Sequence, residues 1–130
     1  MLKKFNPGNI MPPFNNAYHH GVLIPAGAET LHISGQVGAA PDGTTSSDPA
    51  EQAEQIWRNL IAILENAEMT VANIAKLTAY IVSDDVYPAY AAVRNRHLGD
   101  LPPPASTAIY VPKLIKPEWL IEVEMVAAKT

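Results

Sequence analysis

Two glutamates near the end of the chain are the side chains best suited to proton transfer. Glu122 and Glu124 stand two residues apart in the segment 121–127, which alternates apolar and polar side chains from Ile121 to Met125. Successive side chains of a strand point to opposite faces, so both carboxylates are expected on one face. A carboxylate there can position or deprotonate water, or it can be an ordinary solvated residue. We expect the chemical role for Glu122, and an ion pair with a cation at the subunit interface for Glu124.

Histidines and one serine are the other polar candidates. His19 and His20 could serve as acid or base near neutral pH, or could simply lie on a loop surface. Neither His32 nor His97 stands at a ligand spacing from another metal-binding residue, so no metal site is predicted. The chain has no cysteine, which excludes thiolate chemistry. Ser106 lies in no Gly-x-Ser-x-Gly motif, so a hydrolase nucleophile is not indicated.

Two helices are predicted to support these residues. Apolar side chains recur at three- and four-residue steps over 53–67, which is typical of a helix with one buried face. Asp48 is predicted to cap its N-terminus, with Pro49 at the first helical position and Glu51 completing a capping box. The second helix is predicted over 86–98.

Strands are predicted from alternation and from flanking turn residues. They cover residues 18–24, 30–36, 74–82, 105–111 and 120–128. In the second of them, Leu31 and Ile33 are expected on one face, with His32, Ser34 and Gln36 on the other.

The order of these elements predicts the fold class. Strand, strand, helix, strand, helix, strand, strand is an α+β pattern in which both helices can cover one face of a single sheet. Residues 25–29 are expected to join the first two strands as a hairpin. The apolar side of the last strand, from Ile121 to Ala127, would face the helices. The opposite, mixed face carries both glutamates and is expected to be covered by a partner chain.

Length and composition limit the remaining possibilities. The chain has 130 residues, of which 48% are hydrophobic and 17% charged, so we expect one folded domain over residues 1–130. A formal charge of −4 provides no sequence-wide positive field, and no nucleic-acid partner is expected. No segment reaches the roughly 18 apolar residues of a membrane-spanning helix, so no membrane association and a cytoplasmic location are expected.

Several short segments together resemble a known family. They are Tyr18, Ser34-Gly35-Gln36, Gln52–Asn59, Ile74–Ile81, Pro104-Ala105 and Ile121–Ala127. In this order and spacing they resemble the RidA (YjgF) family of small enamine and imine deaminases, whose members include endoribonuclease L-PSP-like proteins. The resemblance implies a chorismate-mutase-like fold, a single mixed sheet with two helices on one face. It also implies a homotrimer around a central barrel, with clefts between subunits.

The same resemblance implies a reaction and a set of site residues. The reaction is hydrolysis of a carbon–nitrogen double bond, for which no cofactor is expected. By position, Glu122 would hold the catalytic water and Tyr18 would close the cleft. The other residues that the resemblance places at the substrate are Ser34, Gly35, Gln36, Ser106 and Ala108. His19, His20 and Trp119, which stands in a one-residue insertion before the last strand, are candidates for the cleft lining.

One departure from the family pattern bears on the substrate. Ser106 in Pro104-Ala105-Ser106-Thr107 stands where the family's deaminases carry an arginine that binds the substrate carboxylate. A neutral hydroxyl lacks the charged, bidentate grip of a guanidinium. The substrate is therefore expected to be a small enamine, imine or related compound other than a standard 2-iminoacid. The alternatives are a non-catalytic small-molecule-binding or regulatory trimer and, less favoured by the acidic composition, a ribonuclease.

Overall fold

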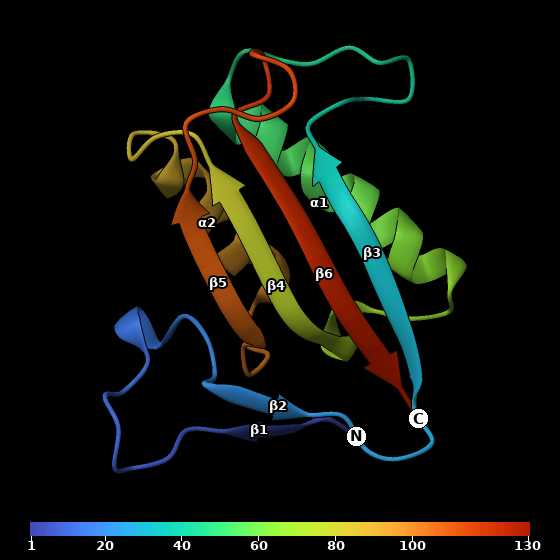
Figure 1. Ribbon diagram of the computed structural model, residues 1–130. Helices are drawn as coiled ribbons and strands as arrows, with labels where there is room; N and C mark the ends of the chain where they lie inside the picture. The colour runs from blue at the N-terminus through green and yellow to red at the C-terminus, as the bar shows by residue number, and fades with distance from the viewer.

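A computed structural model describes residues 1–130 (Figure 1). Its regular elements are β1 (Lys3–Phe5), β2 (Gly21–Leu23), β3 (Glu29–Val37), α1 (Pro49–Asn66), β4 (Ile74–Ile81), α2 (Tyr87–Leu98), β5 (Ala105–Tyr110) and β6 (Ile121–Lys129). Two single 3₁₀ turns, Phe14–Asn16 and Val71–Asn73, lie between them. Neither α1 nor α2 is both long and apolar enough to cross a membrane.

Four strands form one mixed sheet in the order β3-β6-β4-β5. β6 is antiparallel to both β3 and β4, whereas β4 and β5 run parallel. Figure 1 shows α1 and α2 on the same side of this sheet, which leaves the opposite face without a covering helix. The predicted α+β class, with a mixed sheet and two helices on one face, is confirmed.

The hydrophobic core lies between the two helices and the covered face of the sheet. Trp57 and Leu60 of α1 are fully buried there, as are Leu77 of β4 and Val123 of β6. The apolar side of β6 therefore faces the helices as the alternation predicts. Tyr90, on the buried stripe of α2, is 1% exposed.

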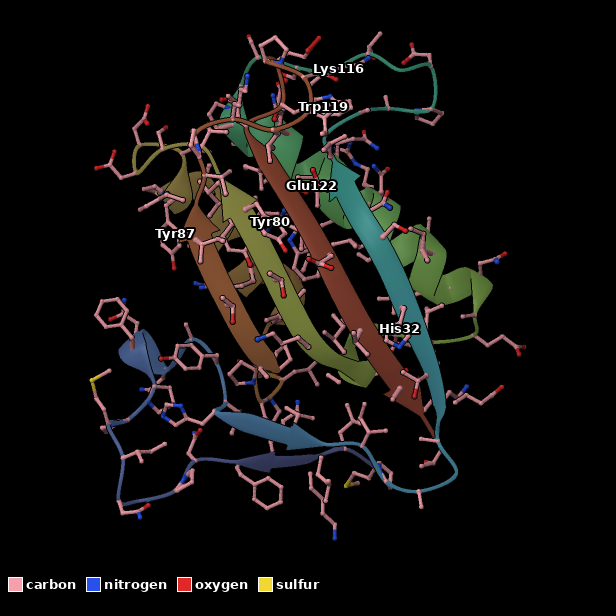
Figure 2. The ribbon with its side chains drawn as sticks, viewed as in Figure 1. His32, Tyr80, Tyr87, Lys116, Trp119 and Glu122 are labelled. Carbon is pink, nitrogen blue, oxygen red and sulfur yellow. The ribbon has the colours of Figure 1, made fainter.

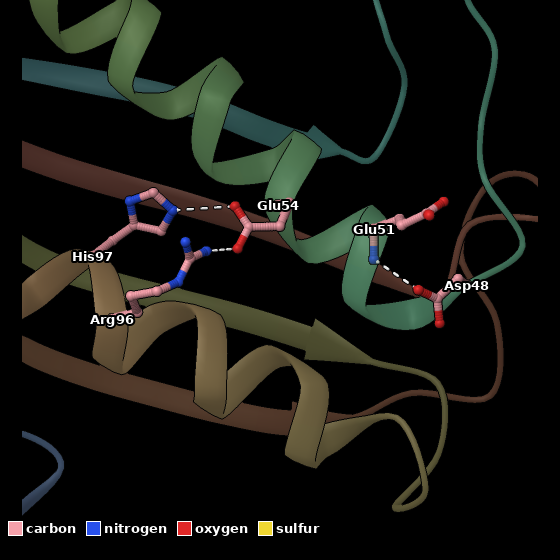
Figure 3. Close-up of polar contacts among 5 residues, drawn as sticks. All are labelled: Asp48, Glu51, Glu54, Arg96 and His97. Atoms are coloured by element: carbon pink, nitrogen blue, oxygen red, sulfur yellow. Dashed lines mark hydrogen bonds and ion pairs between the residues drawn. The ribbon is translucent and has the colours of Figure 1, made fainter.

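The start of α1 follows from the residues before it. The Asp48 carboxylate accepts a hydrogen bond from the Glu51 backbone N–H at 3.3 Å, so the predicted N-cap is confirmed (Figure 3). The predicted capping box is wrong, because the Glu51 carboxylate accepts from the Ser46 hydroxyl at 2.5 Å instead of returning to Asp48. Ser46 also accepts from the Asp48 N–H at 3.0 Å, which leaves that donor satisfied.

One cluster of polar side chains joins the two helices (Figure 3). The Glu54 carboxylate of α1 pairs with the Arg96 guanidinium of α2 and lies 3.5 Å from His97 Nε2. The His97 ring stacks on the buried Trp57 indole, with 5.2 Å between ring centroids. This contact lies on the side of the helices turned away from the open face of the sheet.

The predicted hairpin of the first two strands is wrong. Residues 21–23 pair with β1 in a separate two-stranded sheet, and β3 pairs with β6. The turn after β2 does form, with Ala28 N–H donating to the Pro25 carbonyl at 3.3 Å. β3 pairs elsewhere because the nine-residue β6 continues the hydrophobic core, which the three-residue β2 cannot do.

Candidate functional site

The largest cavity lies at the β5 edge of the sheet, between α2, β5 and the segment Phe14–Tyr18. Its volume is about 630 Å³, large enough for a small metabolite. It is lined by Phe14, Asn15, Asn16, Ala17, Tyr18, Ile81, Tyr87, Ala91, Arg94, Asn95, Ser106, Ala108, Ile109 and Tyr110. Three of the residues expected at the substrate, Tyr18, Ser106 and Ala108, are therefore brought together here.

The parallel pairing of β4 with β5 turns Ser106 toward this cavity. Ser106 lies opposite Leu77 and Ala108 opposite Ala79, and both β4 partners are fully buried against the helices. Directly opposed residues share a face of the sheet. Ser106 and Ala108 therefore lie on the α2 side, and Thr107 and Ile109 point to the other side.

Arg94 of α2 lines the same cavity and was not identified from the sequence. It is only 4% exposed, and it makes no ion pair with any acidic side chain of the chain. Its Nε donates to the Asn95 side chain at 3.1 Å, and its guanidinium lies 5.3 Å from the centre of the Tyr90 ring. The sequence signal was available, because Arg94 follows Tyr90 by one helical turn on the buried stripe of α2.

Behind Arg94, the Tyr90 hydroxyl is buried without a hydrogen-bond partner. Burial raises the pKa of Tyr90, and the nearby Arg94 guanidinium and Ser106 hydroxyl act in the opposite direction. Tyr90 itself is not among the residues that line the cavity.

Glu122 lies in a different place, on the face of the sheet that the helices leave open. Figure 2 shows Glu122 and Tyr80 on this face and Tyr87 at the β5 edge. A shallow hollow of about 500 Å³ surrounds the carboxylates. Its lining residues are Gly35, Tyr80, Lys113, Leu114, Ile115, Glu122 and Glu124.

The two glutamates of this hollow differ in their partners. Glu124 accepts a hydrogen bond from the Tyr80 hydroxyl at 2.5 Å, and this bond raises the pKa of Tyr80. Within the chain the partner of Glu124 is thus the tyrosine of the adjacent strand, and the ion pair expected at an interface stays a prediction. Glu122 makes no hydrogen bond or ion pair within the chain, although its side chain is half-buried. Its carboxylate is free to act on another molecule.

Gly35 leaves the space that the Glu122 carboxylate occupies. A Cβ at position 35 would lie 2.8 Å from the Glu122 Cδ and would overlap one carboxylate oxygen. This close approach occurs where the β3–β6 register shifts by one residue between Ile33 and Gln36. Gly35 therefore faces Glu122 directly, as the resemblance placed it.

The same register shift changes the position of Gln36. After the shift, Gln36 lies opposite Val123, whose side chain faces the helices. The expectation that Gln36 shares a face with His32 and Ser34 is wrong, because an extra residue reverses the alternation of side chains. The Gln36 amide donates only to the Ser34 carbonyl, at 3.1 Å, and neither residue lines either hollow.

A buried amide of α1 fixes the segment that leads into Glu122. Gln52 is fully buried and accepts from the Leu120 N–H at 3.0 Å. Its amide nitrogen donates to the carbonyls of Glu118 at 2.8 Å and Ser46 at 2.7 Å. Both polar atoms of the Gln52 side chain are hydrogen-bonded, so the start of β6 is fixed in position relative to α1.

The candidate lining residues His19, His20 and Trp119 are engaged elsewhere. His19 Nδ1 lies 2.6 Å from the Pro103 carbonyl, and His20 Nε2 lies 2.7 Å from the Met11 carbonyl. The Trp119 ring lies 5.3 Å from the Lys116 ammonium. None of the three lines the cavity or the hollow. No group of three or more His, Asp or Glu side chains is placed to hold a metal ion.

The cavity and Glu122 are thus separated by the sheet itself. Ser106 and Arg94 lie on the α2 side, whereas Glu122 lies on the open face. A ligand in the cavity of one chain cannot reach Glu122 of that chain through the backbone of β4 and β5. The two parts can meet only if a second copy presents its open face to the β5 edge.

Comparison with known proteins identifies a matching family and several similar structures. Residues 11–129 match the family model described as "Endoribonuclease L-PSP". A RutC family protein of Aquifex aeolicus is 34% identical over 102 residues, covering 76% of this chain and 80% of the relative. Among solved structures, YyfB of Yersinia pestis, a Rid family protein of unknown function, is 32% identical with a TM-score of 0.87 and 98% coverage of both chains. TdcF of E. coli with bound serine is 25% identical with a TM-score of 0.73, covering 95% of this chain and 93% of TdcF.

Proposed function

Because this chain belongs to the endoribonuclease L-PSP family, which includes the Rid and RutC proteins, we propose that it hydrolyses the carbon–nitrogen double bond of a small imine, or of the imine that an enamine forms by moving a proton from nitrogen to carbon. Water adds to the carbon of the double bond, and the adduct then collapses to a carbonyl compound and ammonia. The sites are clefts between the subunits of a homotrimer.

Glu122 is the group that we assign to the water. Addition of water to an imine requires a base that takes up a proton and returns it to the departing nitrogen. The Glu122 carboxylate has no partner in the chain and lies against Gly35, where no side chain shields it. The neighbouring Glu124 is already bound to Tyr80. The free carboxylate of Glu122 is the observation that carries this proposal.

The subunit cleft is supported by exposed apolar side chains around the cavity and the hollow. Phe14 is 67% exposed, Ile109 46%, Tyr110 56% and Ile115 87%. Such a group of exposed hydrophobic side chains is typical of an interface. A neighbouring subunit that presents its open face to the β5 edge would cover those around the cavity and would bring its Glu122 toward it.

A trapping assay tests this function. An amino-acid oxidase generates imines in the presence of semicarbazide, and a deaminase lowers the amount of trapped semicarbazone. Wild type should suppress trapping, and Glu122→Gln should lower the rate of suppression by about a hundred-fold or more while leaving the oligomer intact. Glu124→Gln is the matched control, since it removes a carboxylate from the same face and should keep most of the activity. Full activity of Glu122→Gln would contradict the mechanism.

The second candidate is a non-catalytic protein that binds a small molecule. It is favoured by the structure of the related TdcF, which holds serine. The cavity of this chain has the volume and the mixed lining that such a ligand needs. A ligand that binds tightly, with no suppression of trapping by any imine, would establish this function in place of the first.

A further inference from the structure

The cavity at the β5 edge contains a single charged side chain. Arg94 is the only Lys, Arg, Asp or Glu among its lining residues. The guanidinium is almost completely buried, and no carboxylate of the chain neutralises it. A buried charge without a partner is costly, so an anion in the cavity would be stabilised by Arg94.

The donors of Arg94 that remain free are those suited to a carboxylate. Its Nε is bound to Asn95, and no hydrogen bond within the chain uses the two terminal nitrogens. The Tyr90 ring supports the guanidinium, which fixes its plane. A planar fork with free N–H groups can bind both oxygens of one carboxylate.

Neutral donors are grouped around the same point. The Tyr90 hydroxyl lies close to Arg94 and Ser106 but is buried behind the lining of the cavity. Ser106 lines the cavity itself. An anion held by Arg94 could accept a hydrogen bond from the Ser106 hydroxyl.

The rest of the lining indicates the body of the ligand. The walls include Phe14, Tyr18, Ile81, Tyr87 and Tyr110, and no acidic side chain. Aromatic and aliphatic walls favour a hydrophobic body, and one guanidinium without a second cation fits a singly charged group better than a phosphate.

We propose that Arg94 anchors the carboxylate of the ligand, so that the cavity takes a small carboxylate with a hydrophobic body. This inference rests on the proposed function in treating the cavity as the substrate's place. Ser106, in place of the family's arginine, by itself predicts a substrate other than a standard 2-iminoacid. The cation on the neighbouring helix changes that expectation, because it reaches the same cavity from α2 instead of from β5.

Binding of phenylacetate and of phenylacetamide to the assembled protein tests the proposal. The two probes have the same size and shape and differ in charge, and calorimetry measures each dissociation constant without turnover. Wild type should bind phenylacetate about ten- to a hundred-fold more tightly than phenylacetamide. Arg94→Met should lose this preference. Arg96→Met, on the same helix but outside the cavity, is the control and should keep it.

The ratio of the two affinities separates ligand binding from a structural role. If Arg94 only packs on Tyr90 or pairs with a carboxylate of a neighbouring subunit, Arg94→Met will weaken both probes equally or dissociate the oligomer, which would overturn the proposal. If Arg94→Met does not fold, Arg94→Gln replaces it in this comparison, because glutamine keeps a polar group next to Asn95 and Tyr90. Equal affinity of wild type for the two probes would also overturn it.

The same measurement distinguishes this proposal from the proposed function. Glu122→Gln should retain the preference for phenylacetate, because it affects only the chemical step. A charge preference without any suppression of trapping would contradict the deaminase and leave the Arg94 site in place. Suppression of trapping without a charge preference would contradict the Arg94 site and leave the deaminase in place.

Discussion

The cavity beside α2 and the hollow on the open face of the sheet differ in charge and in covering. The cavity has aromatic walls and one buried cation, Arg94, with no acidic side chain. The hollow is shallow and contains two carboxylates, of which Glu122 has no partner. Each region has what the other lacks for hydrolysis of an anionic imine: one can hold the ligand, and the other can activate water. The sheet separates them within one chain, so the proposed site requires two copies.

Mixing of two inactive variants is the strongest test of this division. Ala108→Trp fills the cavity, and Glu122→Gln removes the carboxylate, so each variant alone should be inactive. When equal amounts are reassembled together, about one cleft in four combines an intact cavity with an intact Glu122. Activity should therefore rise from almost none to about a quarter of the wild-type value, as measured by the trapping assay.

Mass spectrometry of the intact assemblies is the control for the mixing. If mixed oligomers form and remain inactive, the cavity and Glu122 do not serve a common cleft, and the two regions have separate roles.

Gly35→Ala tests the hollow without changing its charge. The added methyl group would displace the Glu122 carboxylate, which is the flexible end of its side chain, so the fold should persist. We expect kcat/KM to fall about ten- to a hundred-fold, because misplacement of a catalytic group by about 1 Å has effects of this size. Gly21→Ala is the matched control, since a Cβ there meets no atom within 4 Å. Equal activity of the two variants would show that the position of Glu122 does not matter.

Gln52→Leu tests how the hollow depends on the helix behind it. The change leaves the Leu120 N–H and two carbonyls without their buried partner. The free energy of unfolding should fall by about 2–4 kcal/mol, as measured by urea titration at a fixed protein concentration. Gln55→Leu, which removes contacts only with other side chains, should cost less than about 1 kcal/mol.

Measuring the affinity of Gln52→Leu for phenylacetate shows whether the change affects the hollow alone or also the cavity. The affinity should be unchanged in folded Gln52→Leu, because Gln52 supports the start of β6 and lies outside the cavity. A large loss of phenylacetate binding would show that the two regions are not independent.

His97→Phe has the smallest expected effect and concerns the contact between the helices, outside both regions. Burial, with the nearby Arg96 guanidinium, lowers the pKa of His97 below its ordinary value of 6.5, although Glu54 lies 3.5 Å away. The unfolded chain then takes up a proton at higher pH than the folded chain, so stability should fall as the pH drops through about 6.5. Phenylalanine can keep the stacking on Trp57 without titrating.

Thermal unfolding at a series of pH values measures this effect. The melting temperature of His97→Phe should decline less on acidification than that of wild type, with no change in the preference for phenylacetate. An identical pH dependence of the two proteins would exclude His97 as the titrating group.

Local patterns in the sequence predict most of the secondary structure. The buried stripe of α1, the Asp48 cap and the apolar side of β6 all follow from periods of 3.6 and 2, which are properties of a single segment. The pairing of β3 with β6 and the position of Gln36 could not be predicted in this way. They depend on which distant strand completes the core and on one extra residue that reverses the alternation.

For the candidate site, the sequence by itself determined the types of residue: a carboxylate at position 122, a glycine at 35 and a serine at 106, each in a segment that resembles a known family. Only the tertiary structure decided their placement. The parallel register of β4 and β5 turns Ser106 to the helix side, and the antiparallel register of β4 and β6 turns Glu122 to the open face. The fold also places Arg94 in the cavity: its spacing from Tyr90 indicates the buried side of α2, but only the packing of α2 on the sheet forms the cavity that Arg94 lines.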